Sequence, residues 1–288
     1  MSVRVGPELA GRLDAAVRRL APGFSRRLVR ALIAEGAVRV NGRPARKGAR
    51  VAPGDVVELP ALAGIAPDPD VALRILYEDA DLVAIDKPGG VRGHALDPRQ
   101  RRTIAGALVA RDPAQAGIGD PLSGGLVHRL DTGTSGVLVA ARTPASWTAL
   151  RAAFRRHDVV KRYVAIVAGL PAVGTVVDVP LAHDPQDRRR MRPARSGDRA
   201  WPASTRVCEV AVHGTRAAVT VEIRSGVTHQ VRAHLAWLGH PVVGDALYGG
   251  EASVLPAGRH ALHAATLEIP GRGLRVTAPL PDEMRALA

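Results

Sequence analysis

A change of pattern after residue 72 constrains the fold of this 288-residue chain more than any other feature. From Leu73 onward, short apolar runs are separated by turn residues, which is typical of β-strands. Helical spacing interrupts this pattern at 103–110, 144–156 and 228–238. Strands with interspersed helices predict an α+β domain built on a mixed or antiparallel sheet. The expected strands are Leu73–Tyr77, Leu82–Asp86, Gly136–Ala141, Arg162–Val167, Thr205–Val210, Ala217–Arg224 and Ala261–Ile269.

The first 60 residues follow a different pattern. Apolar residues recur at helical spacing over 13–20, and Ser25 is a suitable N-cap for a second helix over 26–35. A strand then leads into the tight turn Asn41-Gly42, and a returning strand follows at 56–59. This order predicts a small domain of two short helices and a β-hairpin.

The two patterns together predict two domains, at 1–60 and at 73–288. The segment between them, 61–72, contains one glycine and two prolines and shows no periodicity. We interpret it as a linker, because glycine and proline interrupt regular structure.

The charge of the chain favours a polyanionic partner. It carries 40 Lys and Arg against 27 Asp and Glu, and its pI is about 11.2. Residues 1–60 hold 12 of the basic residues and only 5 of the acidic ones. Nucleic acid is the usual partner of such a protein. All the basic residues except Lys47, Lys87 and Lys161 are arginines, whose planar fork suits phosphate oxygens.

Other classes of protein fit the sequence poorly. Cys208 is the only cysteine, so no intrachain disulfide or thiolate metal site is expected. The ten histidines are not spaced as metal ligands, and no stretch of 18 apolar residues could cross a membrane. The first nine residues do not resemble a signal peptide. We therefore expect a cytoplasmic protein that binds no metal.

The segment around Asp131 is the strongest candidate for chemistry. An apolar strand at 126–127 leads to this carboxylate, and the turn 132–136 leads into a second strand. Loops held by rigid strands often carry reactive groups. Arg129 lies two residues away and is expected to keep the carboxylate ionised, as a nucleophile or a base requires. An aspartate before Thr-Gly-Thr is also an ordinary turn former, so the residues alone leave both interpretations open.

The run His128-Arg129-Leu130-Asp131, followed two residues later by Thr-Ser-Gly, resembles the signature of the RluA-type RNA pseudouridine synthases. In that family the aspartate attacks the target uridine, and the base is released, rotated and rejoined to the sugar through carbon 5. The resemblance implies that Asp131 is the nucleophile. It also implies that Arg129 enters the RNA stack in place of the flipped nucleotide.

Further segments match the same family in the same order. Lys161–Val167 resembles the strand whose tyrosine, here Tyr163, packs against the uracil and has been proposed as a general base. Gly226–Leu235 resembles a helix start whose arginine, here Arg232, pairs with the catalytic aspartate. Thr228 is the expected N-cap of that helix. The segments 240–249 and 260–264 resemble the end of the domain. Val227 departs from the family, which usually has Arg or Lys there.

Two basic regions are candidates for RNA binding. Residues 1–60 resemble the RNA-binding domain of ribosomal protein S-four, and this implies an RNA-facing surface near Arg26, Arg27, Arg30 and Arg46. The loop 183–200 is a second basic run, which includes Arg188, Arg189 and Arg190. We expect it to grip the RNA backbone beside the active site; the alternative is a solvated flexible loop.

The resemblance implies an isomerase that converts specific uridines of structured RNA to pseudouridine, without a cofactor or a metal. The N-terminal domain favours large-subunit ribosomal RNA as the substrate, and transfer RNA is the alternative. A different alternative stays open: an RNA-binding or ribosome-assembly factor that keeps the fold without catalysis. Nothing in the chain demands an oligomer, so we expect a monomer.

Overall fold

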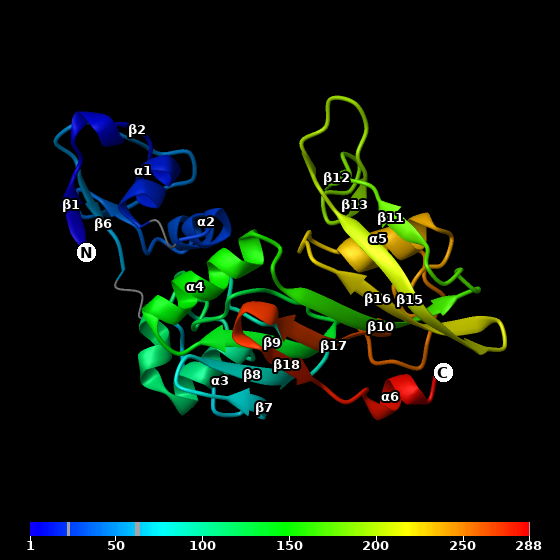
Figure 1. The fold of residues 1–288 in the computed structure, drawn as a ribbon. Helices are drawn as coiled ribbons and strands as arrows, with labels where there is room; N and C mark the ends of the chain where they lie inside the picture. Colours follow the sequence, from blue (N-terminus) through cyan, green and yellow to red (C-terminus); the bar gives the residue numbers. More distant parts are fainter. Residues whose placement is uncertain (22–23, 61–63, 288) are drawn as a thin grey trace.

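The computed structural model describes residues 1–21, 24–60 and 64–287, which form a small N-terminal part and a larger part (Figure 1). Of the expected linker, residues 61–63 lie outside the described residues. Its later residues pack on the larger part, where Ile65 is buried in the core and Asp68 accepts the N–H of Arg102. The two parts also touch through exposed side chains, since Arg99 pairs with Glu35 at 2.7 Å.

The N-terminal part contains the two helices and the hairpin that the sequence predicts. Ser25 Oγ accepts the N–H of Leu28 at 3.1 Å and caps α2, as expected. Asn41 and Gly42 both have positive φ, which a two-residue turn of this kind requires. Its sheet has the order β1-β6-β3-β4, and β2 pairs with β5. The elements are β1 (Ser2–Arg4), β2 (Gly11–Arg12), α1 (Leu13–Leu20), α2 (Arg26–Ala34), β3 (Arg39–Val40), β4 (Arg43–Pro44), β5 (Arg50–Val51) and β6 (Val56–Glu58).

The larger part is built on a nine-stranded sheet of order β11-β15-β16-β10-β17-β9-β8-β7, with β18 paired to β17. Only β17 and β9 run parallel among these pairs, so the predicted mixed sheet is confirmed. The strands are β7 (Arg74–Glu78), β8 (Leu82–Lys87), β9 (Ser135–Ala141), β10 (Val160–Ala168), β11 (Val176–Asp178), β15 (Ser204–His213), β16 (Arg216–Ile223), β17 (Leu262–Ile269) and β18 (Leu274–Thr277). The seven expected strands are all present, with ends shifted by a few residues.

The helices of the larger part are α3 (Ile104–Arg111), α4 (Pro144–Arg155), α5 (Gln230–Trp237) and α6 (Asp282–Arg285). Thr103 and Thr143 cap the first two through their hydroxyl groups. The prediction for α5 was wrong at its start. Thr228 is not the N-cap; the helix begins at Gln230, and the cap position is His229 in a left-handed conformation. The expected strand at 126–127 is only an isolated bridge, from Leu126 to Ala140.

The basic run also differs from a plain loop. Three short strands, β12 (Leu181–His183), β13 (Met191–Pro193) and β14 (Ala200–Trp201), form a sheet of order β13-β12-β14. We call residues 181–201 the basic arm. Leu181 and Met191 of the arm are buried in one cluster with Ala233 of α5 and with Tyr248. The arm is therefore anchored on the helix that carries Arg232, and only its tip projects from the molecule (Figure 1).

Candidate active site

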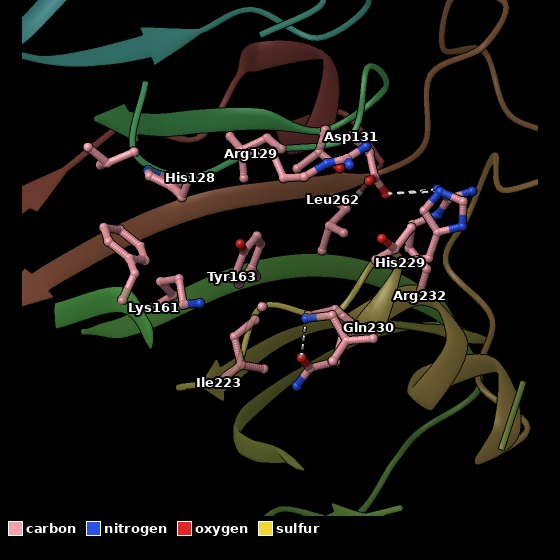
Figure 2. A pocket seen from close by; sticks show the side chains of 18 of the residues that line it. His128, Arg129, Asp131, Lys161, Tyr163, Ile223, His229, Gln230, Arg232 and Leu262 are labelled. Atoms are coloured by element: carbon pink, nitrogen blue, oxygen red, sulfur yellow. Dashed lines mark hydrogen bonds and ion pairs between the residues drawn. The ribbon is translucent and has the colours of Figure 1, made fainter. Parts of the chain in front are cut away.

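A cavity of about 280 Å³ lies between the segment 127–134, strand β10 and the start of α5. It brings together Asp131, Tyr163 and Arg232, the three residues that the sequence singles out for catalysis. Figure 2 shows Asp131, His229 and Arg232 at one end of this cavity, His128 and Lys161 at the other, and Tyr163 between them.

Arg232 links two carboxylates. Its Nη1 donates to Oδ2 of Asp131 at 2.8 Å. Its Nε and Nη2 donate to the two carboxylate oxygens of Asp245, at 2.6 and 2.8 Å. Such a bidentate pair fixes the plane of the guanidinium. Asp245 is only 2% exposed, so a buried acid on one side aims the arginine at Asp131 on the other.

Asp131 is largely buried and yet remains ionised. Burial acts to raise the pKa of its carboxyl group, but a protonated His229 and the Arg232 guanidinium act against this, and the pKa lies below its ordinary value. Because burial lowers the pKa of His229 itself, its imidazole is neutral at neutral pH, and the permanent charge beside Asp131 is that of Arg232. The expectation that Arg129 supplies the stabilising charge was wrong. Arg129 lines the cavity as an exposed side chain, whereas the ion pair within 4 Å is made by Arg232.

Tyr163 lies on β10 and is 8% exposed. Burial, and then the charge of Asp131, raise the pKa of its hydroxyl well above the ordinary value. The hydroxyl therefore stays protonated at neutral pH and can donate a hydrogen bond. The family resemblance suggests that Tyr163 acts as a general base. To act so as a phenolate, its hydroxyl would have to ionise far more easily than this environment allows.

The turn that follows Asp131 is held from behind by four basic side chains. Each binds one of the next four residues: Lys87 to Thr132 O at 3.3 Å, Arg259 to Gly133 O at 2.9 Å, His260 to Thr134 Oγ1 at 2.8 Å and His263 to Ser135 Oγ at 2.9 Å. At the end of the turn, Gly136 has φ +110, and a Cβ there would lie 2.2 Å from the backbone of Ala264. The Thr-Ser-Gly of the signature thus fits the parallel contact between β9 and β17.

Sequence reasoning missed two buried lysines, one that lines the cavity and one that holds the turn after Asp131. Lys161 donates to Ser225 O at 2.6 Å, and burial lowers its pKa to about 8. Lys87 is fully buried, and burial followed by the charge of Arg259 lowers its pKa to about 7. One signal could have found both. They are two of only three lysines in a chain whose other basic residues are arginines.

The expected RNA-binding arginines lie outside the cavity, apart from Arg129 on its rim. All of them are exposed: Arg26, Arg27 and Arg30 on α2, Arg46 after β4, and Arg188, Arg189 and Arg190 in the basic arm. Arg189 pairs with Asp187 at 2.7 Å. The guanidinium of Arg190 lies 5.5 Å from the ring centre of Tyr248.

Val227, the departure from the family pattern, is half-buried and packs against the cluster that anchors the basic arm. Among residues 1–21, 24–60 and 64–287, no group of three His, Cys, Asp or Glu side chains could hold a metal ion. Within the same residues, no helix is long and apolar enough to span a membrane.

Known proteins are similar to this chain both in sequence and in fold. Residues 81–237 match the RNA pseudouridylate synthase family, and residues 11–57 match the S4 domain. Ribosomal large subunit pseudouridine synthase D of Xanthomonas campestris is 36% identical, over 96% of this chain and 87% of its own. An uncharacterized RNA pseudouridine synthase of Chloroflexus aurantiacus is 37% identical, over 96% of this chain and 89% of its own.

The solved structures agree with this. Human RNA pseudouridylate synthase domain containing 4 is 26% identical with a TM-score of 0.59, over 74% of this chain and 90% of its own. Human RNA pseudouridylate synthase domain containing 1 is 28% identical with a TM-score of 0.57, over 72% of this chain and 83% of its own. The chain belongs to the RNA pseudouridylate synthase family and is an RNA pseudouridine synthase with an N-terminal S4 domain.

Proposed function

We propose that Asp131 is the nucleophile of uridine isomerisation, that Arg232 holds it, and that Tyr163 contacts the uracil. The contact between Arg232 and Asp131 carries this proposal. Since Asp245 occupies Nε and Nη2 of the guanidinium, the third nitrogen, Nη1, faces Asp131 and keeps a buried carboxylate charged at the cavity wall. An ionised carboxylate in a site shielded from water is a good nucleophile.

The chemistry follows from this arrangement. Asp131 attacks the sugar carbon that bears the base, and the uracil leaves with the bonding electrons as an anion. The released base turns and rejoins the sugar through carbon 5, which displaces the carboxylate. Tyr163, protonated and on the cavity wall, suits a residue that packs against the ring and donates to it. Arg129, exposed on the cavity rim, suits the space that the flipped nucleotide leaves in the RNA.

We propose large-subunit ribosomal RNA as the substrate. This rests on the names of relatives such as ribosomal large subunit pseudouridine synthase D of Xanthomonas campestris and of Vibrio cholerae. The RNA would be held by two regions, Arg26, Arg27, Arg30 and Arg46 in the N-terminal part and Arg188, Arg189 and Arg190 in the basic arm. Transfer RNA is the alternative substrate.

The organisation we propose is an RNA-binding domain at 1–60, a connection at 61–72 and a catalytic domain at 73–288. We further propose a cytoplasmic monomer that uses neither metal nor cofactor. The support for this is that one chain contributes the nucleophile, its arginine and the tyrosine to a single cavity. The substrate named for the relatives is also part of the cytoplasmic ribosome.

Replacing the nucleophile tests this proposal. Asp131→Ala and Asp131→Asn should lower pseudouridine formation by at least about 10⁴-fold, because catalysis by the nucleophile is lost. RNA affinity should change by less than about twofold, since the variants remove no phosphate contact. Asp282→Asn, an exposed carboxylate on α6, is the matched control and should be fully active.

The measurement is release of tritium from carbon 5 of labelled ribosomal and transfer RNA, together with mapping of the modified sites. Wild-type turnover in either Asp131 variant would refute the assignment. Modification of transfer RNA alone would refute ribosomal RNA as the substrate without affecting the proposed role of Asp131.

A further inference from the structure

His229 has an unusual backbone for a residue beside the nucleophile. Its φ of 55° and ψ of 17° are left-handed, a conformation that residues other than glycine rarely adopt. The neighbouring Gln230 enforces this geometry. Its Oε1 accepts from Ser225 Oγ and from Val227 N, and its Nε2 donates to Ser204 O at 2.9 Å. Strain that the surroundings maintain at a cavity wall points to a function for the strained residue.

The imidazole of His229 is fixed at one nitrogen and open at the other. Nδ1 lies 3.0 Å from the hydroxyl of Tyr248, which also accepts the N–H of Met191 at 2.8 Å. Nε2 lies 3.8 Å from Oδ2 of Asp131 and, within the described part of the chain, makes no hydrogen bond. When Nδ1 carries the proton and donates it to Tyr248, the lone pair of Nε2 faces the cavity beside Asp131.

Pseudouridine formation needs a base in this place. When carbon 5 has joined the sugar, it still carries its hydrogen, and carbon 6 is double-bonded to N1. A base must take that proton; the C–H electron pair then restores the double bond between carbons 5 and 6, and N1 gains a proton. Carbon 5 is at this stage bonded to the sugar carbon that Asp131 has just left. The base must therefore lie within a few ångströms of the Asp131 carboxylate.

Other titratable groups of the cavity suit this role less well. Tyr163 is protonated, and so are the arginines of the cavity wall. Burial lowers the pKa of His128 to about 3, and its Nε2 already accepts the N–H of Val139. Lys161 donates to Ser225 O and, with a pKa of about 8, is mainly charged at neutral pH. Two groups remain, His229 and the regenerated Asp131 itself.

We propose that His229 is the general base that removes the carbon 5 proton, and that Tyr248 is the positioning residue that orients it. The inference rests on Asp131 as the nucleophile. When carbon 5 displaces Asp131 from the sugar, the carboxylate becomes anionic again, 3.8 Å from Nε2. That charge stabilises the imidazolium at the moment it forms. The imidazolium then returns its proton to N1 of the new nucleotide or to water.

His229→Gly tests the inference with little risk to the fold, because glycine readily adopts φ 55°. We expect kcat on transcribed large-subunit ribosomal RNA to fall by about 10²- to 10³-fold. RNA affinity should stay within about twofold. Added imidazole should restore the rate at least about tenfold. Transcripts deuterated at carbon 5 should react at least about twofold more slowly than protiated ones in this variant, since proton removal then limits the rate.

Tyr248→Phe should lower kcat by about tenfold without a change in KM for RNA, because the ring stays and only the bonds of the hydroxyl to His229 Nδ1 and to Met191 N are lost. His157→Gly is the matched control. His157 is also left-handed, with φ 61°, but it is exposed and lies outside the cavity. This variant should be fully active and insensitive to imidazole.

Activity of His229→Gly near the wild-type level would overturn the inference. A loss of activity with neither imidazole rescue nor an isotope effect would overturn it too, because it would indicate a structural role and leave Asp131 as the base. Neither result touches the proposed nucleophile, which the Asp131 variants test separately.

Discussion

The two basic regions of the molecule are joined to the active site in different ways. The N-terminal part has its own apolar core, and its contacts with the larger part include the exposed pair of Glu35 and Arg99. The basic arm shares a buried cluster with α5 and Tyr248, and the guanidinium of Arg190 stacks over the Tyr248 ring. If both regions bind RNA as we propose, the first should supply affinity alone. The second should also influence the residues around Arg232, because it shares a buried cluster with them.

Acid should most strongly separate the N-terminal part from the larger part, to which the basic arm belongs. Residues 1–60 contain no histidine, whereas burial lowers the pKa of His260 and His263, behind the catalytic turn, to about 4. These values lie below the unfolded value of about 6.5. Below about pH 6.5 the unfolded chain therefore binds protons at these two histidines that the folded larger part does not bind. The larger part keeps its full stability above about pH 6.5 and loses stability as the pH falls toward 4.

We expect the larger part to unfold at a steadily lower temperature between pH 7 and about 4.5, while the N-terminal part stays folded. Trp147, Trp201 and Trp237 all lie in the larger part, so tryptophan fluorescence follows it alone. Hydrogen exchange in peptides from 1–60 follows the other part. His263→Gln should reduce the pH dependence. Unfolding of both parts at the same pH would contradict the expected difference between them.

A matched pair of core substitutions should show which region affects catalysis. Leu181 in the arm and Leu28 in α2 are both almost fully buried. Either change to alanine should cost about 2–5 kcal/mol of stability in its own region. We expect Leu181→Ala to lower kcat, because the cluster against Tyr248 loosens, and Leu28→Ala to raise KM alone. Steady-state kinetics with thermal unfolding would show this; equal losses of kcat would contradict it.

Removing surface charge should have the smallest effect. Triple alanine variants at Arg26, Arg27 and Arg30 or at Arg188, Arg189 and Arg190 should each weaken RNA binding by about 10- to 100-fold. The slope of log Kd against log salt should fall by up to about 3 in each case. Only the arm variant should also reduce kcat, through the lost contact of Arg190 with Tyr248. Unchanged salt slopes would show that the arginines do not touch phosphate.

Much of the fold could be predicted because the relevant signals are local. The cap at Ser25 and the turn at Asn41-Gly42 depend on neighbouring residues, and the strand pattern depends on alternation over a few positions. The strands of the basic arm were not predicted. They are only two or three residues long, too short for any periodicity, and they exist because Leu181 and Met191 are buried against α5.

The start of α5 shows why a local signal can fail. Thr228 is a favourable N-cap by residue type. The side chain of Gln230, which binds Ser225, Val227 and Ser204, instead forces His229 into the left-handed region and delays the helix to Gln230. Bonds to a neighbouring strand thus outweighed a capping preference of about 1 kcal/mol.

The sequence by itself determined the kind of chemistry, because Asp131, Tyr163 and Arg232 lie in contiguous motifs whose order can be read along the chain. The tertiary structure decided how that chemistry is supported. Asp245 aims Arg232, four buried basic side chains hold the turn after Asp131, and burial keeps Tyr163 protonated while His229 faces Asp131. These properties arise from groups up to 128 positions apart and from the loss of water around them. A local sequence pattern predicts neither contacts between residues that are distant in sequence nor the burial of those residues.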